Sequence, residues 1–304
     1  SRNIRWCRLF FFARQVAIVV VWVIHSWSDY WVSGYGKSPV GDMTSENTKT
    51  QFLQLQNNVS LAYHQTPGST PGVMFLGGFK SDMNGSKALA LDSWCKQQGR
   101  AFLRFDYQGH GQSSGDFVDG TIGGWAADAM AALDNLTEGP QVLVGSSMGG
   151  WIMLLTALQR KPCVAGLLGL AAAPDFTEDL MWDAFSDEDR AAFEQNDGLE
   201  IPNCYDDEEG YVISRGLIEE GRNQLLLRSS IDLDVPVRLI QGMQDEDVPW
   251  ATTQRITEQL GSTDVEIQYV KDGDHRLSRP NDLDRLCTTL DALIHHIENP
   301  LVPK

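Results

Sequence analysis

The chain has 304 residues, of which 42% are hydrophobic and 21% charged, and its formal net charge is −17. This length is enough for one large α/β domain or for two smaller domains. The acidic balance argues against nucleic acid as a partner, because no basic surface would replace the counterions of a phosphate backbone. The five cysteines are scattered without a C-x-x-C pair. We therefore predict reduced thiols in a cytoplasmic protein, with neither a metal cluster nor a disulfide framework.

Residues 1–42 differ in composition from the rest of the chain. They carry four arginines, four of the nine tryptophans and an apolar run at 16–24. Three interpretations compete: sequence translated upstream of the native start, a signal or anchor segment that would make the protein secreted or membrane-anchored, and a transit peptide, for which the segment has few serines and is very apolar. We favour the first, because the nine-residue run is too short to span a bilayer and Met43 resembles an ordinary bacterial start. Residues 43–304 are then expected to form the domain, without stable membrane insertion.

From residue 52 onward, short apolar runs alternate with segments of helical spacing. The first two runs flank Asn57-Asn58 and predict a hairpin. The expected strands are 52–56, 60–65, 73–76, 101–105, 141–144, 164–170, 237–240 and 265–270, and the expected helices are 86–98, 122–136, 151–159, 251–260 and 281–297. This alternation predicts a mostly parallel central sheet with helices on both faces, opened by antiparallel strands.

The alternation stops between about residues 174 and 230. This segment is acidic and has short helical pieces at 180–185 and 221–227. We predict a small helical lid inserted over the strand ends, with its acidic runs exposed to solvent. Met181, Trp182 and Phe185 could line a substrate pocket, although their helical spacing favours simple packing.

A nucleophile is predicted where the expected strand 141–144 ends. Gly145-Ser146-Ser147-Met148-Gly149 is a G-x-S-x-G sequence between an expected strand and an expected helix. The turn is so sharp that only glycine fits on either side of the serine, and it exposes the serine Oγ at the positive end of the helix. Ser147 is therefore the candidate nucleophile.

A serine nucleophile needs a base within hydrogen-bond reach and an acid that orients the base. Asp245 follows the expected strand 237–240, and we predict it as the acid in preference to its neighbours Glu246 and Asp247. Of the six histidines, His275 alone lies on a post-strand loop after the candidate acid, so we predict it as the base.

The tetrahedral intermediate of such a reaction needs two N–H donors for its oxyanion. Met148, the residue after the nucleophile, is expected to supply one of them. The other is expected from the loop after strand 73–76, which reads Gly77-Gly78-Phe79, and the Phe79 N–H is the candidate.

A second glycine-rich loop, at residues 109–115, resembles a dinucleotide-binding sequence. Ser114 stands where the third glycine is required, and no acidic residue follows at the expected place, so we predict no nucleotide cofactor. His110 in this loop is expected to make a turn hydrogen bond. Adjacent His295 and His296 are expected on a solvated helix face, and no metal site is predicted.

Four stretches resemble one protein family: residues 75–88, 104–111, 145–151 and 242–250. They are similar to the branch of the α/β-hydrolases that includes a mitochondrial palmitoyl-protein thioesterase, which is also an acyl-glucuronide esterase, and bacterial relatives. The resemblance runs from about residue 73 to the C-terminal helix. It implies an α/β-hydrolase fold and a cofactor-free serine hydrolase of carboxylic esters or thioesters, with Ser147, His275 and Asp245 as its triad. Residues 1–42 match nothing in this pattern, so a mitochondrial location is not implied.

We expect a serine esterase, most simply a bacterial carboxylesterase, whose partner is a small acyl ester or thioester and which acts through an acyl-enzyme. The alternatives on the same triad are a depalmitoylating acyl-protein thioesterase and a lactone or amide hydrolase. The alternative from another class is a non-catalytic binding module on the hydrolase scaffold. Such modules usually lose a triad residue, and all three are present here.

Overall fold

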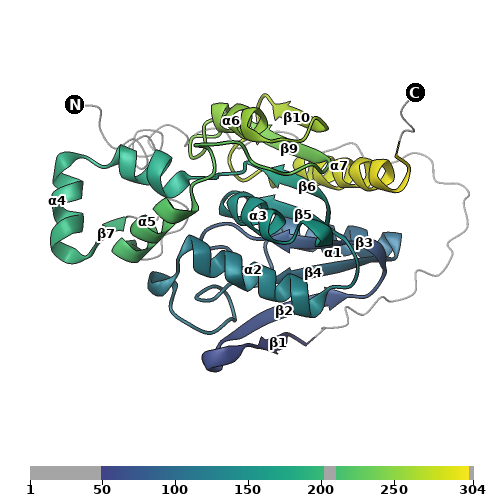
Figure 1. The fold of residues 1–304 in the computed structure, drawn as a ribbon, viewed down its shortest axis with the longest axis horizontal. Helices are drawn as coiled ribbons and strands as arrows, with labels where there is room; N and C mark the ends of the chain where they lie inside the picture. The colour runs from purple at the N-terminus through teal and green to yellow at the C-terminus, as the bar shows by residue number, and fades with distance from the viewer. Residues whose placement is uncertain (1–48, 202–209, 301–304) are drawn as a thin grey trace, which may run out of the picture. The chain divides into compact units, whose positions relative to one another are not determined.

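The computed structural model describes residues 49–201 and 210–300, so the prediction for residues 1–42 falls outside the described residues. The described part is built on an eight-stranded sheet with the strand order β1-β2-β4-β3-β5-β6-β9-β10 (Figure 1). Its strands are β1 (Gln51–Gln54), β2 (Ser60–Thr66), β3 (Ser69–Leu76), β4 (Arg100–Phe105), β5 (Gln141–Ser146), β6 (Val164–Leu170), β9 (Val237–Gly242) and β10 (Val265–Val270).

The sheet begins at one edge with antiparallel strands and is parallel elsewhere. β1 pairs with β2 and β2 with β4 in antiparallel fashion, whereas the remaining neighbours are parallel. Alternate side chains of β3 enter two different cores: Val73 and Phe75 enter one, and Met74 and Leu76 the other. A parallel strand covered on both faces needs such a continuous apolar run, which is why these strands were recognisable in the sequence.

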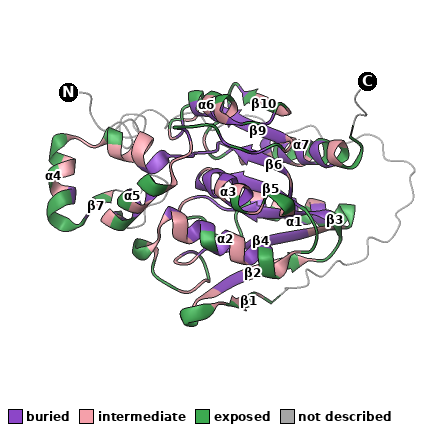
Figure 2. Ribbon diagram, viewed as in Figure 1, coloured by how far each residue is buried: buried purple, intermediate pink, exposed green. Residues whose placement is uncertain are grey.

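Five long helices cover the two faces of the sheet. α1 (Ser86–Gln98) and α7 (Pro280–Glu298) contribute to one core, and α2 (Ile122–Leu136), α3 (Met148–Gln159) and α6 (Ala251–Gln259) contribute to the other. α1, α2, α6 and α7 bury their inward faces and expose residues on their outward faces, whereas α3 is buried on nearly all sides (Figure 2). All five predicted helices are therefore present, and the observed architecture agrees with the predicted mostly parallel sheet.

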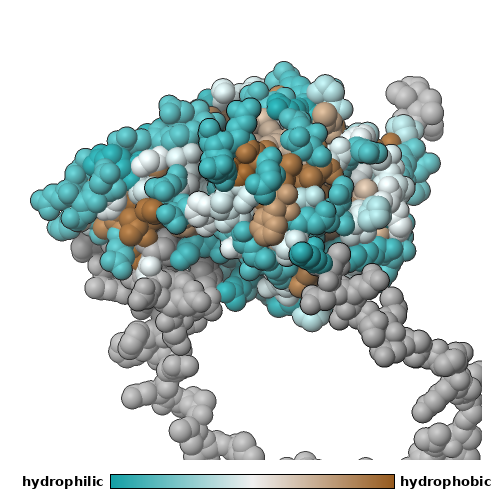
Figure 3. Space-filling model, turned by 90° about the horizontal axis from the view of Figure 1, so that it is seen from below, coloured by the Kyte–Doolittle hydropathy of each residue, from teal (hydrophilic) through white to brown (hydrophobic). Residues whose placement is uncertain are grey.

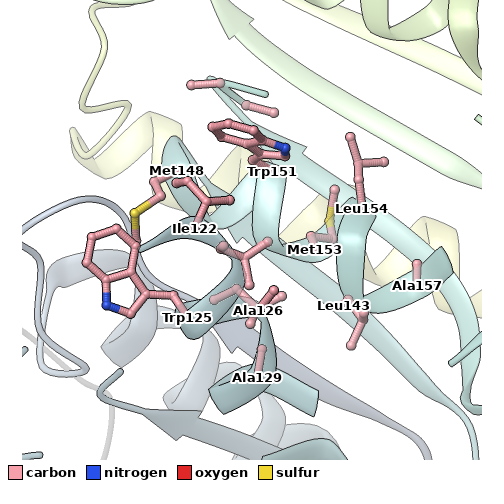
Figure 4. Close-up of a cluster of buried hydrophobic side chains, with 14 of the residues drawn as sticks. Ile122, Trp125, Ala126, Ala129, Leu143, Met148, Trp151, Met153, Leu154 and Ala157 are labelled. Carbon is pink, nitrogen blue, oxygen red and sulfur yellow. The ribbon is translucent and has the colours of Figure 1, made fainter. Parts of the chain in front are cut away.

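The core between α2 and α3 supports the end of β5. Trp125 on α2 and Met148 and Trp151 on α3 are buried there with small residues such as Ala126 and Ala129 (Figure 4). The small residues let the two helices approach closely, and each large buried side chain contributes about 2–3 kcal/mol of hydrophobic stabilisation. The start of α3 is thereby fixed against the sheet.

The segment between β6 and β9, residues 174–230, forms an insertion that we call the cap. Its elements are η4 (Thr177–Met181), η5 (Trp182–Ala184), α4 (Asp187–Asn196), β7 (Gly198–Ile201), β8 (Tyr211–Ser214), α5 (Arg215–Gly221) and η6 (Arg222–Gln224). The antiparallel pair β7–β8 was not predicted, because two four-residue strands carry too short a pattern.

The acidic run 187–189 in the cap has a structural role that the sequence prediction missed. It forms the first turn of α4, where Ser186 and Asp189 make a reciprocal capping box. Carboxylates at this place offset the positive end of the helix dipole and bind free N–H groups. The visible surface of the cap is mostly hydrophilic, at the left of Figure 3.

Hydrogen bonds join the cap to three helices of the sheet, and one of them runs from Arg255 Nη1 on α6 to Asp179 Oδ2 at 2.8 Å. The Gly123 N–H donates to Glu220 Oε2 at 2.8 Å, and the Trp151 indole N–H donates to the Gln224 carbonyl at 3.0 Å.

In the part of the chain that the structure describes, no helix is long and apolar enough to cross a membrane.

Candidate active site

Ser147 is the single residue between β5 and α3. Its backbone has φ 55° and ψ −120°, a conformation that residues with a side chain rarely adopt. A Cβ on Gly145 would lie 2.4 Å from the Gly149 carbonyl oxygen, and one on Gly149 would lie 2.0 Å from the Leu76 carbonyl oxygen. Both glycines are therefore required sterically, and they allow the turn that projects the Ser147 side chain.

Three predicted residues from separate loops are joined by hydrogen bonds at this turn. Ser147 Oγ lies 3.0 Å from His275 Nε2, and His275 Nδ1 lies 2.9 Å from Asp245 Oδ2. The Asp245 carboxylate can only accept, so Nδ1 carries the proton and Nε2 is free to accept from the serine hydroxyl. The Asp245 side chain is fully buried, whereas that of His275 is 18% exposed. The arrangement can therefore move a proton from Ser147 to His275.

Asp245 is fixed by three further hydrogen bonds. Its Oδ1 accepts from the backbone N–H groups of Asp247 at 3.0 Å and Val248 at 2.8 Å, and its Oδ2 accepts from Gln241 Nε2 at 2.9 Å. Gln241 is fully buried in β9 and accepts in turn from Thr253 Oγ1. Sequence reasoning missed Gln241, although a polar side chain at the end of an apolar strand was a usable signal.

The two carboxylates that compete with Asp245 in the sequence lie differently. Glu246 is exposed. Asp247 is partly buried, and burial raises the pKa of its carboxyl while the neighbouring His275 lowers it. Ligand atoms of Asp245, Asp247 and His275 lie within 4.8 Å of one another, so the group has the spacing of a metal site. We assign no metal to it, because His275 and Asp245 use their facing atoms to bond each other.

The loop after β3 passes beside the nucleophile. A Cβ on Gly78 would lie 3.5 Å from Ser147 Cβ, so the Gly78 backbone approaches the serine closely. The Ser81 N–H donates to the Gly78 carbonyl at 3.1 Å and closes a turn that contains Phe79. On the other side, Met148 is the first residue of α3, so its N–H belongs to the helix end and has no acceptor within the helix. Both candidate oxyanion donors thus belong to segments that adjoin Ser147.

The Phe79 ring packs against three other aromatic rings. Its centroid lies 4.8 Å from that of Phe117, 5.9 Å from that of Trp125 and 5.8 Å from that of Phe176, in edge-to-face arrangements. Such pairs stabilise beyond their buried area, by roughly 1 kcal/mol each. The side chain of Phe79 therefore restricts the position of its own backbone.

Three further histidines also had predicted surroundings. His110 makes the predicted turn contact, with its Nδ1 3.2 Å from the Gln108 carbonyl. His295 is exposed, as predicted for a solvated helix face, and His296 is partly exposed with its Nε2 2.7 Å from Asp264 Oδ2. Asp264 is brought there by the β9–β10 end of the sheet, a contact that sequence spacing could not reveal.

The aromatic residues of the cap pack against one another. The Trp182 centroid lies 5.9 Å from that of Phe185 and 5.5 Å from that of Phe193. The guanidinium groups of Arg190 and Arg222 lie over the Trp182 ring. These contacts give Trp182 and Phe185 a packing role in the cap.

The fold and the residues at Ser147 together define a class of protein. Residues 92–286 match the alpha/beta hydrolase family, and the chain belongs to that family. It is 39% identical over 249 residues to "Palmitoyl-protein thioesterase ABHD10, mitochondrial" of Mus musculus, which covers 82% of this chain and 84% of the mouse protein.

Two solved structures share the same level of identity. Alpha/beta hydrolase domain-containing protein 10 from mouse aligns with a TM-score of 0.77 and 39% identity, covering 82% of this chain and 99% of the mouse chain. A putative hydrolase from Agrobacterium vitis S4 aligns with a TM-score of 0.77 and 39% identity, covering 81% and 98%. This chain is therefore an α/β-hydrolase related to a thioesterase and to a bacterial hydrolase.

Proposed function

We propose that the protein is a serine hydrolase that cleaves carboxylic esters or acyl-thioesters through an acyl-enzyme, with Ser147, His275 and Asp245 as its catalytic triad. The observation that carries the proposal is the line of hydrogen bonds from Ser147 Oγ through His275 to the buried Asp245. A serine hydroxyl is a weak nucleophile by itself, and an oriented imidazole is the group that activates it.

In the proposed reaction, His275 Nε2 takes the Ser147 proton as Oγ attacks the acyl carbon. Asp245 holds the imidazole in the required tautomer and stabilises its charged form. The N–H groups of Met148 and Phe79 bind the developing oxyanion, and each such donor is worth about 3 kcal/mol in the transition state. His275 then returns the proton to the leaving group, and water, activated by the same imidazole, releases the acyl group from Ser147.

For the substrate, a carboxylic ester is the first candidate and an acyl-thioester the second. The thioester has specific support, because the mouse relative is named a palmitoyl-protein thioesterase and covers most of this chain. Both substrates pass through the same acyl-enzyme, so the triad does not distinguish them. An ester and a thioester differ in the leaving group, which is an alcohol in the first and a thiol in the second. The length of the acyl chain is a separate feature of the substrate that the triad does not determine either.

A substrate panel on matched variants tests this proposal. Turnover would be measured on p-nitrophenyl esters and on acyl-thioesters of the same chain lengths, for the unmodified protein, Ser147→Ala and Ser146→Ala. We expect Ser147→Ala to lose at least about 10³-fold in kcat, because the attacking atom is gone. Ser146→Ala should retain a measurable turnover. The proposal fails if Ser147→Ala hydrolyses these substrates as fast as the unmodified protein.

The cytoplasm is the location that we propose, on the evidence of the cysteines. The three described cysteines, Cys95, Cys163 and Cys287, carry free thiols, which fits a reducing compartment. Fractionation of the native host with an antibody against the protein would test this, and recovery from the periplasm or medium would contradict it.

A further inference from the structure

One buried imidazole outside the proposed triad contacts the loop that runs past the nucleophile. His110 follows β4, is only 4% exposed, and its Nε2 lies 3.2 Å from the Lys80 backbone nitrogen. Its Nδ1 lies 3.2 Å from the Gln108 carbonyl oxygen. A carbonyl oxygen only accepts and an amide N–H only donates, so the two partners together select the neutral Nδ1–H tautomer. Burial lowers the pKa of His110, which also favours the neutral ring.

The amide that His110 accepts from lies next to the candidate oxyanion donor. Lys80 follows Phe79 and has a φ of 56°, in the left-handed region that favours glycine. Together with the Ser81 N–H to Gly78 carbonyl bond, this φ describes a turn over residues 78–81 in which a lysine takes a glycine position. A turn with that residue choice depends on outside contacts to hold its shape.

The His110 ring also shares an aromatic support with Phe79. It lies 5.2 Å from the Phe117 centroid and 5.1 Å from the Trp125 centroid, both edge to face. These are the same two rings that contact Phe79. Lys80 adds a third link, because its ammonium lies 5.8 Å from the Phe117 centroid. His110 and the turn are therefore fixed against one common surface.

We propose that His110 is a positioning residue for the oxyanion hole: its neutral imidazole holds the turn at 78–81 so that the Phe79 N–H meets the oxyanion formed at Ser147. The inference rests on the proposed function, because it takes Phe79 as the second oxyanion donor. Gly78 connects the turn to the nucleophile, since a Cβ there would lie 3.5 Å from Ser147 Cβ. A small shift of the turn would therefore change the distance from the donor to the reacting oxygen.

Two substitutions separate this role from simple packing. His110→Phe keeps the ring and its edge-to-face contacts but removes both ring nitrogens. His110→Gln keeps an acceptor and a donor on one amide. Leu133→Ala, in the buried face of α2, is the matched control, because it removes buried apolar packing but no hydrogen-bonding group.

The decisive readout is the affinity for a trifluoromethyl ketone transition-state analogue, whose serine adduct carries an oxyanion, measured beside kcat and KM for a p-nitrophenyl ester. For His110→Phe we expect kcat and analogue affinity to fall together by about 10- to 100-fold while KM stays within about twofold. His110→Gln should recover most of both losses. Leu133→Ala should lower the melting temperature but leave kcat and analogue affinity unchanged.

The inference is overturned if His110→Phe behaves like Leu133→Ala, losing stability but not analogue affinity. Should His110→Phe fail to fold, nitrogen NMR of the histidine-labelled unmodified protein decides, because a neutral Nε2–H tautomer at His110 would contradict the assigned role. An unmodified protein that turns over no ester or thioester would overturn the proposed function and this inference with it. An active protein with an unaffected His110→Phe variant overturns the inference alone.

Discussion

At the residue scale, the two carboxylates Asp245 and Asp247 differ in what surrounds them. Asp245 accepts hydrogen bonds from two backbone N–H groups, the Gln241 amide and the His275 ring, and its side chain is fully buried. Asp247 donates its backbone N–H to Asp245, and its own carboxyl has a pKa that burial raises and His275 lowers. An acid that orients a base must be fixed itself, so the surroundings favour Asp245 for that role.

The matched pair Asp245→Asn and Asp247→Asn tests this assignment. We expect Asp245→Asn to lower kcat by about 10³- to 10⁴-fold, because an amide at this place favours the wrong tautomer of His275. Asp247→Asn should cost about tenfold or less, since it removes only a nearby charge. Steady-state kinetics on one ester would check both values, and a larger loss for Asp247→Asn would assign the acid to that residue instead.

The buried carboxyl of Asp128 on α2 should make the free energy of unfolding depend on pH. It is 2% exposed and accepts from the Gln108 N–H and side-chain amide, and burial raises its pKa to about 6. A carboxyl whose pKa is raised by folding contributes stability that is present below its unfolded pKa and is lost as the pH rises through the folded value. Between pH 5 and 7.5, Asp128 should therefore lower the free energy of unfolding by about 1 kcal/mol.

Urea unfolding of Asp128→Asn beside the unmodified protein checks this value at the two pH values. The stability of the variant relative to the unmodified protein should rise by about 1 kcal/mol from pH 5 to pH 7.5, because the asparagine does not titrate. A difference that stays constant with pH would show that Asp128 keeps its ordinary pKa.

At the element scale, the space around a glycine determines whether it can be replaced. Gly149 lies at the tight junction of β5 and α3, whereas Gly85 lies at the start of α1. A Cβ on Gly149 would lie 2.0 Å from the backbone oxygen of Leu76, whereas one on Gly85 meets nothing nearer than 3.7 Å. Gly149→Ala should therefore lower the free energy of unfolding by about 2–4 kcal/mol, because β3 or α3 must move. Gly85→Ala should change it by less than about 0.5 kcal/mol. Equal effects in urea unfolding would contradict the steric account.

The elements of the sheet could be predicted better than those of the cap. α1 and α2 have the predicted bounds, because their apolar spacing faces a large core. β3 begins at Ser69, four residues before the prediction, because its first residues pair in the sheet without an apolar pattern. In the cap, β7 and β8 stabilise each other across a small antiparallel pair, and a pattern of four residues gives no periodicity to recognise.

At the scale of the whole molecule, the parallel sheet explains why much of the site was predictable. Ser147, Asp245 and His275 each follow a strand, and parallel strands bring such loops to one edge. His110 was not assigned a role at the site, because its partner Lys80 is 30 residues away in sequence. Gln241 is only four residues from Asp245, but sequence spacing does not show that the loop after β9 folds back onto the end of the strand. A motif indicates the reacting groups, whereas their supports depend on tertiary contacts.

The central claim is that Ser147 carries the acyl group during turnover. The most direct measurement is mass spectrometry of the protein mixed with a p-nitrophenyl ester or an acyl-thioester and quenched in acid within one turnover. The account predicts a mass increase equal to the acyl group, located by peptide mapping on Ser147 and absent in Ser147→Ala. An acyl group on another residue, or hydrolysis by Ser147→Ala at the unmodified rate, would contradict it.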